Sequence, residues 1–314
     1  MKIVFLDEAT VGKMPAMKKI ASLGEYIAYD FSTAEQVLER INDADVVITN
    51  KILITRDMMK ANPKLKLICL SATGMNNVDL PAAMELGVAV KNVAGYSTNS
   101  VAQLTFALLF EHICHVNHFD SFVKSGAYSA SKSFTSINPS YSELAGKTFG
   151  IVGLGAIGSK VATIAEAFGA EVVYYSTSGA NNNSHFKRVE FEELLSSCDI
   201  ISIHAPLNEA TKNLFGEEQL SAMKSTVIIV NVGRGGIVNE SALAKAIDNN
   251  IIGGACLDVF VEEPMPKNSP LMQVKNKHKI VYTPHIAWAS EEARVRLMEM
   301  LYQNIIDWQG EGNN

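Results

Sequence analysis

A glycine-rich segment near the middle of the chain constrains the fold more than any other feature of the sequence. Residues 148–161 read TFGIVGLGAIGSKV, in which a Gly-x-Gly-x-x-Gly pattern separates an apolar run from a helical pattern. This order is typical of a βαβ unit that binds a dinucleotide. The first glycine permits a tight turn, the second lets the backbone approach a pyrophosphate, and the third lets the helix pack on the strand. The pattern predicts a phosphate-binding turn at Gly153, Gly155 and Gly158.

The phosphate-binding turn lies almost halfway along the 314 residues, although such a turn normally follows the first strand of its fold. The residues before it have an α/β pattern of their own, without a glycine-rich turn. β-Branched runs predict buried parallel strands at 2–7, 26–30, 45–50, 65–72 and 88–93. Helical patterns predict one helix at 32–41, with Ser32 as its N-cap, and another at 79–87.

A second α/β series contains the phosphate-binding turn. Residues 101–116 predict a long helix that is apolar on most faces, and therefore buried against its own sheet and another subunit. Residues 124–146 are polar and predict a surface excursion. Further strands are expected at 147–153, 170–176, 199–206, 225–233, 253–260 and 279–287, and further helices at 156–169, 190–198, 240–250 and 290–309. The alternation predicts the α/β class, with two doubly wound parallel-sheet domains.

Charge and composition exclude several classes of function. The formal net charge is −6 and the acidic residues are scattered, so nothing indicates binding to nucleic acid or to an anionic membrane. No stretch approaches the ~20 apolar residues of a membrane span, and Asp7 comes too early for a signal peptide. The four cysteines lie far apart without a C-x-x-C pair, which indicates reduced thiols in a cytoplasmic protein.

Three histidines, His112, His115 and His118, suggest a metal site at first sight. On one continuous helix their spacing would spread them over about 120° of the helix surface. Zinc needs ligands that converge on one point. We therefore predict no metal site, and interpret the cluster as a helix end or a subunit contact.

Ionisable residues follow three of the strands predicted in the second series. Arg234 lies in NVGRGGIV, Asp258 and Glu263 lie in LDVFVEEP, and His285 lies in TPHIAWAS. Ligands of open α/β sheets bind at the carboxyl ends of strands. Arg234 there suits a carboxylate, which a guanidinium can bind in a bidentate manner, or it forms an internal salt bridge. His285 is either a capped loop histidine or an acid/base. Because other ionisable residues follow neighbouring strands of the same sheet, the acid/base interpretation is favoured.

One expected residue of a dinucleotide site is missing. An acidic residue should end the strand after the phosphate-binding turn, where it would hold the ribose 2′-hydroxyl. The strand EVVYYS ends at Ser176 instead. Either serine, water and backbone bind the ribose, or the site tolerates a 2′-phosphate. The nearest cations in the sequence are Lys187 and Arg188, so the sequence removes a barrier to NADP(H) without clearly supplying a phosphate ligand.

Several motifs in this order resemble those of the D-isomer-specific 2-hydroxyacid dehydrogenase family, over essentially the whole chain. They are SATGMNNVD, NVAGYSTNSVAQLT, GIVGLGAIG, HAPLNEATKNLF, NVGRGGIV, LDVFVEEP and TPHIAWAS. The resemblance implies a Rossmann cofactor domain, residues 98–287, inserted into a flavodoxin-like substrate domain, residues 1–97 and 288–314. It also implies an active site in the cleft between them, an NAD(H) or NADP(H) cofactor, and a homodimer built largely on the helix near 101–116.

The resemblance also implies roles for individual residues. Arg234 is similar to the arginine that binds the substrate carboxylate and carbonyl. His285 is similar to the acid/base, and Glu263 is similar to the carboxylate that pairs with this histidine and favours its imidazolium form. Thr73, Gly74 and Met75 resemble the loop whose amides bind the substrate carboxylate. The implied cofactor contacts, beyond the three glycines and Ser176, are Thr98, Ala156, Ile157, His204, Pro206, Thr211, Val232, Gly233, Arg234, Asp258 and His285.

Within the family, HIAWAS and YYSTSG are most similar to glycerate dehydrogenase, also called hydroxypyruvate reductase. The implied reaction transfers a hydride between NAD(P)H and a small 2-oxo acid, with hydroxypyruvate or glyoxylate giving D-glycerate or glycolate. A dehydrogenase of another acid, such as D-lactate or 3-phosphoglycerate, is an alternative function. A dinucleotide-sensing regulator is a second alternative, because the C-terminal-binding-protein corepressors share the scaffold. The lack of a disordered tail or basic run favours the enzyme.

Overall fold

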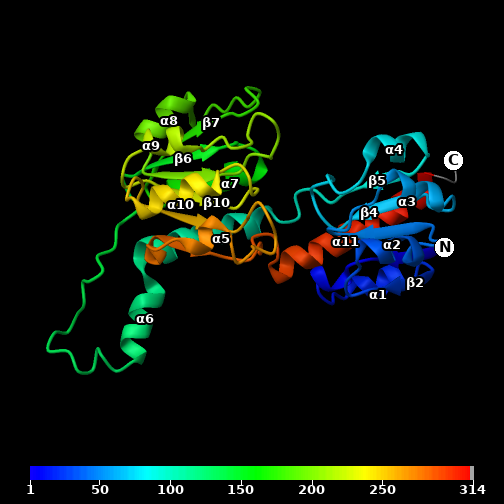
Figure 1. Ribbon diagram of the computed structural model, residues 1–314, viewed down its shortest axis with the longest axis horizontal. Helices are drawn as coiled ribbons and strands as arrows, with labels where there is room; N and C mark the ends of the chain where they lie inside the picture. Colours follow the sequence, from blue (N-terminus) through cyan, green and yellow to red (C-terminus); the bar gives the residue numbers. More distant parts are fainter. Residues whose placement is uncertain (312–314) are drawn as a thin grey trace. The chain divides into compact units, whose positions relative to one another are not determined.

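The computed structural model describes residues 1–311 and divides the chain into two compact units. Unit 1 consists of Met1–Ser97 and the segment from Trp288 onward, and unit 2 is Thr98–Ala287. Each unit has its own parallel sheet and its own core (Figure 1). No helix in the described part of the chain is long and apolar enough to cross a membrane.

Unit 1 is built on a five-stranded parallel sheet in the order β2-β1-β3-β4-β5, which is the flavodoxin-like order. The strands are β1 (Lys2–Phe5), β2 (Glu25–Ala28), β3 (Val46–Thr49), β4 (Leu67–Leu70) and β5 (Ala89–Lys91). The helices are α1 (Ala16–Ala21), α2 (Ala34–Arg40), α3 (Arg56–Ala61), α4 (Leu80–Glu85) and α11 (Glu291–Glu311). Alternate residues of β4 enter the two cores, with Cys69 packing beside α1 and α11 and Ile68 beside α2, α3 and α4.

Unit 2 is built on a seven-stranded parallel sheet in the order β12-β11-β10-β9-β6-β7-β8. Its strands are β6 (Thr148–Val152), β7 (Glu171–Tyr175), β8 (Lys187–Arg188), β9 (Ile200–Ile203), β10 (Ile228–Asn231), β11 (Gly254–Leu257) and β12 (Ile280–Tyr282). Its helices are α5 (Thr98–Cys114), α6 (Val116–Lys124), α7 (Ala156–Ala167), α8 (Phe191–Ser197), α9 (Glu217–Ser221) and α10 (Glu240–Asp248). Helices α5 and α7 cover one face, and α8, α9 and α10 cover the other. The predicted fold class is confirmed, with the strand order of a Rossmann domain in unit 2.

Two local predictions were wrong. The N-cap of α2 is Thr33 rather than Ser32, because Thr33 and Gln36 satisfy each other's backbone amides in a capping box, while Ser32 donates to the Leu6 carbonyl. The helix predicted at 101–116 ends at Cys114, and His115 adopts a left-handed conformation with φ of +53°. The chain then turns into α6, which the sequence did not predict. His118 therefore lies on a different helix from His112.

Helix α6 and the segment after it project from the body of unit 2 (Figure 1). Residues 125–143 are almost all exposed, as predicted for a surface excursion. The exposed residues include large apolar side chains, among them Phe134 at 89% and Ile137 at 81%. An apolar surface of this kind on a projecting segment is typical of a protein contact.

Candidate functional site

Most of the predicted site residues in unit 2 follow the carboxyl ends of its strands. Gly153 follows β6, Ser176 follows β7, His204 follows β9, Arg234 follows β10, and Asp258 and His285 follow β11 and β12. Because all these strands are parallel and adjacent, their carboxyl ends lie at one edge of the sheet. This edge is where ligands of doubly wound sheets bind.

The glycine-rich turn has the geometry that a pyrophosphate requires. Gly153 has a φ of +90°, and a Cβ atom there would lie 2.9 Å from the Ala205 nitrogen. A Cβ at Gly158 would lie 2.1 Å from the Gly153 carbonyl oxygen, so the helix packs closely on the turn. At Gly155 a Cβ would meet no atom within 4 Å, and Gly155 is the N-cap of α7. The first turn of α7, with Ala156 and Ile157, thus faces open space that fits a phosphate group.

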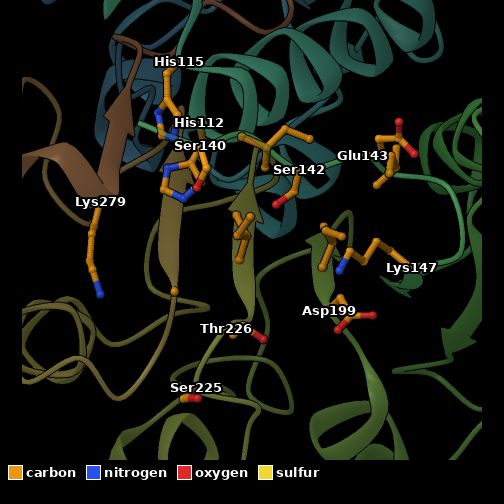
Figure 2. Close-up of a pocket in the computed structure, with 15 residues that line it drawn as sticks. His112, His115, Ser140, Ser142, Glu143, Lys147, Asp199, Ser225, Thr226 and Lys279 are labelled. Atoms are coloured by element: carbon orange, nitrogen blue, oxygen red, sulfur yellow. The ribbon is translucent and has the colours of Figure 1, made fainter. Parts of the chain in front are cut away.

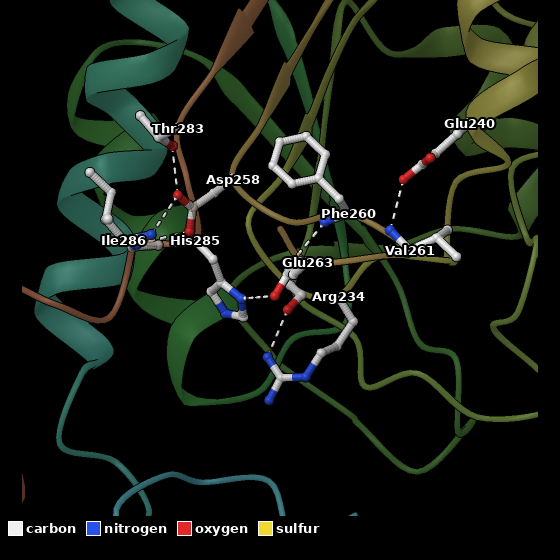
Figure 3. Close-up of polar contacts among 11 residues, drawn as sticks. Arg234, Glu240, Asp258, Phe260, Val261, Glu263, Thr283, His285 and Ile286 are labelled. Carbon is white, nitrogen blue, oxygen red and sulfur yellow. Dashed lines mark hydrogen bonds and ion pairs between the residues drawn. The ribbon is translucent and has the colours of Figure 1, made fainter. Parts of the chain in front are cut away.

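His285 and Glu263 form the closest pair of ionisable side chains at this edge. The distance from His285 Nδ1 to Glu263 Oε2 is 2.6 Å (Figure 3). The second carboxylate oxygen of Glu263 accepts a hydrogen bond from the Phe260 amide at 3.0 Å, which fixes the orientation of the carboxylate. The two side chains are 20% and 29% exposed, so solvent reaches the pair. With Nδ1 engaged, Nε2 is the ring nitrogen that remains to exchange a proton with a ligand.

Asp258 holds the turn that carries His285. Its Oδ1 accepts hydrogen bonds from the Thr283 hydroxyl at 2.6 Å and the Ile286 amide at 2.8 Å, and its Oδ2 accepts one from the Ala287 amide at 2.8 Å (Figure 3). The side chain is fully buried, and burial raises the pKa of its carboxyl group above the usual value, although these hydrogen bonds oppose the shift. Asp258 therefore anchors His285, whose φ of +55° is unfavourable for a side-chain-bearing residue.

Arg234 lies on an exposed turn that is tied to the sheet through its backbone. The Asn231 side chain accepts a hydrogen bond from the Gly233 amide and donates one to the Arg234 carbonyl. A Cβ atom at Gly235 would lie 1.9 Å from the Phe260 carbonyl oxygen, so this turn packs against the segment that leads to Glu263. The Arg234 guanidinium donates to the Gly233 carbonyl at 2.8 Å. Within residues 1–311 no carboxylate forms an ion pair with Arg234, which leaves the internal salt bridge without support.

The sequence did not predict three residues whose side chains hold the segments of this edge in place: Asn231, Thr283 and Glu240. Glu240, at the start of α10, accepts a hydrogen bond from the Val261 amide at 2.7 Å and so holds the segment before Glu263 (Figure 3). The only signal for Asn231 and Thr283 was a polar residue at the end of an apolar strand, in IIVN and IVYT. Nothing in the sequence pointed to Glu240, because its partner lies 21 residues away.

His204, Pro206 and Thr211 lie on the segment after β9. His204 Nε2 is 2.8 Å from the Ser202 hydroxyl, whereas its Nδ1 is buried without a hydrogen-bond partner within the described residues. Burial lowers the pKa of His204 to about 3, so the ring is neutral. Thr211 is fully buried and donates to the Pro206 carbonyl, so its hydroxyl shapes the segment. The backbone of His204 lies against the glycine-rich turn, since a Cβ atom at Gly153 would lie 3.1 Å from the His204 carbonyl carbon.

Other predicted residues lie elsewhere. Thr73, Gly74 and Met75 belong to unit 1, on the segment after β4, where the Thr73 hydroxyl donates to the Val93 carbonyl at 2.9 Å. Thr98 is the first residue of α5. Val232 is buried directly after β10.

A pocket lies at the opposite edge of the unit 2 sheet, near the amino ends of β9, β10 and β11. His112, His115, Lys147, Asp199 and Lys279 are among the residues that line it (Figure 2). The pKa of His112 is lowered to about 4, mainly by burial and to a smaller extent by the neighbouring His115, His278 and Lys279. Within residues 1–311 no group of three or more His, Cys, Asp or Glu side chains is arranged to hold a metal ion.

Comparisons with known proteins agree with this arrangement. Residues 106–287 match the family model described as D-isomer specific 2-hydroxyacid dehydrogenase, NAD binding domain. A hydroxypyruvate reductase of Blautia hydrogenotrophica is 37% identical, over 97% of this chain and 96% of that protein. A glycerate dehydrogenase of Methylorubrum extorquens is 35% identical, over 97% and 95%.

The same relationship appears in solved structures. An acyclic imino acid reductase in complex with NADPH and D-Arg matches with a TM-score of 0.87 and 30% identity, over 99% of this chain and 98% of that one. Each of these three proteins is named for an enzymatic activity, so the comparisons do not favour the corepressor alternative. The chain is an oxidoreductase that uses a nicotinamide cofactor, and it belongs to the D-isomer-specific 2-hydroxyacid dehydrogenase family.

Proposed function

We propose that this protein interconverts hydroxypyruvate or glyoxylate with D-glycerate or glycolate. The observation that carries the proposal is the His285–Glu263 pair, at 2.6 Å, at the same sheet edge as Arg234 and the glycine-rich turn. The relatives named hydroxypyruvate reductase and glycerate dehydrogenase support this substrate class.

In the proposed mechanism each group at the sheet edge has one task. The reduced nicotinamide, when bound, supplies the hydride. Arg234 binds the carboxylate and polarises the carbonyl of the 2-oxo acid, because its guanidinium has no competing acidic partner in the described part of the chain. His285 donates a proton from Nε2 to the carbonyl oxygen, and Glu263 stabilises the imidazolium through Nδ1.

The remaining roles are proposals as well. Unit 1 is the substrate domain, in which the amides of Thr73, Gly74 and Met75 bind the substrate carboxylate, and unit 2 is the cofactor domain. The cofactor contacts are those given above for the glycine-rich turn and for the segments after β9, β10, β11 and β12. Asp258 contributes by positioning His285.

We further propose that the protein is a cytoplasmic homodimer that uses both NADH and NADPH. All four cysteines are free thiols, which suits a reducing compartment. The exposed apolar side chains of α6 and the following segment, such as Phe134 and Ile137, supply a surface for a second copy of the chain. Ser176 puts no negative charge where a 2′-phosphate would lie.

Steady-state turnover tests the proposed function. Hydroxypyruvate, glyoxylate, pyruvate and 3-phosphohydroxypyruvate are each assayed with NADH and with NADPH. The proposal predicts the highest kcat/KM for hydroxypyruvate or glyoxylate. Higher efficiency with pyruvate or the phosphorylated acid would assign a different substrate, and binding of the cofactor without any turnover would return the regulator to consideration.

A further inference from the structure

Strand β8 brings a distant arginine to the place where the acidic residue of a dinucleotide site is missing. This strand is only Lys187–Arg188, and it pairs with β7 so that Arg188 lies beside Tyr174. The guanidinium reaches past the end of β7, and Nη1 donates to the Gly179 carbonyl at 3.0 Å. Arg188 is twelve residues from Ser176 in the sequence, yet it lies against the turn that Ser176 begins.

The turn itself has a fixed shape. The Gly179 amide donates to the Ser176 carbonyl at 3.2 Å, and Gly179 has a φ of +71°. The segment that returns to β8 is held by the Tyr174 hydroxyl, which accepts from the Asn183 amide at 3.0 Å. Thr177 and Ser178 lie on the turn with their side chains partly or fully exposed. Their hydroxyls and the Arg188 guanidinium are therefore donors on one small, solvent-accessible turn.

The charges around this turn leave Arg188 unneutralised. Its neighbour Lys187 forms an ion pair with Glu193 at 2.7 Å, and His185 contacts Glu166 at 2.8 Å. No carboxylate within residues 1–311 pairs with Arg188, and residues 176–186 include no Asp or Glu. Since the backbone carbonyl of Gly179 is its only partner in the described chain, Arg188 keeps most of its five N–H donors and its full charge for a ligand.

We infer that Arg188, together with the hydroxyls of Thr177 and Ser178, forms a binding site for the 2′-phosphate of NADPH. The inference rests on the proposed use of both cofactors and names the group responsible for it. The carboxyl end of the strand after the phosphate-binding turn is where the ribose hydroxyls of a dinucleotide lie in this fold. A guanidinium binds phosphate oxygens with charge-assisted, bidentate hydrogen bonds.

The test compares two ligands that differ only in the 2′-phosphate, 2′,5′-ADP and 5′-AMP, by isothermal titration calorimetry on the full chain. The wild type should bind 2′,5′-ADP more tightly, with a preference that shrinks at high salt. Arg188→Gln should weaken 2′,5′-ADP about tenfold or more and leave 5′-AMP unchanged. Arg188→Lys should retain part of the preference.

Lys187→Gln is the matched control, because this exposed neighbour already has a carboxylate partner and should leave both affinities unchanged. Thermal unfolding of each variant checks the fold. A wild type that prefers 2′,5′-ADP while Arg188→Gln keeps that preference would overturn the role of Arg188 alone. A wild type with no preference would overturn the use of NADPH as well, and neither result depends on which 2-oxo acid is the substrate.

Discussion

Replacing Asp258 with asparagine tests whether this buried carboxylate acts by holding His285 in place. The carboxylate accepts three hydrogen bonds, two through Oδ1 and one through Oδ2. Asparagine has nearly the same shape, and its carbonyl oxygen can replace Oδ1 for Thr283 and Ile286. Its amide group, however, would then face the Ala287 N–H, so that two donors meet and one buried N–H loses its partner.

The expected loss of stability follows from these contacts. A buried donor without a partner costs about 1–3 kcal/mol, and each hydrogen bond that loses charge assistance weakens by up to about 1 kcal/mol. Burial raises the pKa of Asp258, so removal of a costly buried charge offsets part of this loss. We expect a net loss of about 2–3 kcal/mol, or roughly 4–12 °C in the melting temperature of a unit of this size.

The assay pairs thermal unfolding with kinetics. Because the released turn carries His285, Asp258→Asn should lower kcat about ten- to a hundredfold while the affinity for 5′-AMP stays unchanged. Asp248→Ala is the control, since it removes the Oδ1 that accepts two backbone amides, from Lys275 and Asn276, away from the sheet edge. That control should lose stability without losing kcat. Wild-type melting together with wild-type kcat in Asp258→Asn would refute the anchoring role.

Four further predictions test individual side chains. Arg234→Lys keeps the charge but loses the planar guanidinium, so KM for the 2-oxo acid should rise and kcat/KM should fall, with the melting temperature unchanged. A misfolded variant or unaltered kinetics would contradict the proposal that Arg234 binds the substrate. His285→Gln should lower kcat about 10²–10⁴-fold with little effect on cofactor affinity, which steady-state turnover and a titration with the cofactor measure separately. Burial lowers the pKa of His204 to about 3, so below about pH 6.5 the unfolded chain binds a proton that the native state does not, and at pH 5 this costs the native state about 2 kcal/mol; urea unfolding at pH 5 and pH 7 should show that His204→Gln removes this loss of stability. Ser176→Asp should reduce kcat/KM with NADPH relative to NADH about fivefold or more, because a like charge facing a phosphate costs about 1 kcal/mol or more; unchanged ratios would contradict the interpretation of this strand end.

The sequence predicted the sheets well because their signals are local. Most of the buried strands contain β-branched residues, as in Val46–Thr49, and the candidate site residues of unit 2 follow the strands within a few positions. Parallel strands then place those residues at one edge whatever the detailed packing. The wrong or missing predictions concern features that depend on distant partners or on short segments. Helix α6 begins only because His115 reverses the backbone, and a single residue with positive φ has no reliable signal outside glycine.

Arg188 illustrates the same limit at the candidate cofactor site. The sequence marked it only as one of the nearest cations to Ser176, and gave no reason to place its guanidinium against the turn that Ser176 begins. The connection comes from the two-residue strand β8, whose pairing with β7 is a tertiary interaction. A strand of this length is too short to show a period of two, so no pattern in the residues could have predicted it.

Asp258 and Glu263 show why residue type at a strand end does not determine chemical role. Both follow β11, and both carboxylates accept backbone hydrogen bonds. Asp258 is fully buried, and both of its carboxylate oxygens accept hydrogen bonds from the turn that carries His285. Glu263 uses one oxygen to fix its orientation and directs the other to an imidazole that solvent can reach. In the proposed mechanism a proton leaves and returns to His285 while Glu263 accepts the hydrogen bond from the ring, and Asp258 holds the turn that carries the ring.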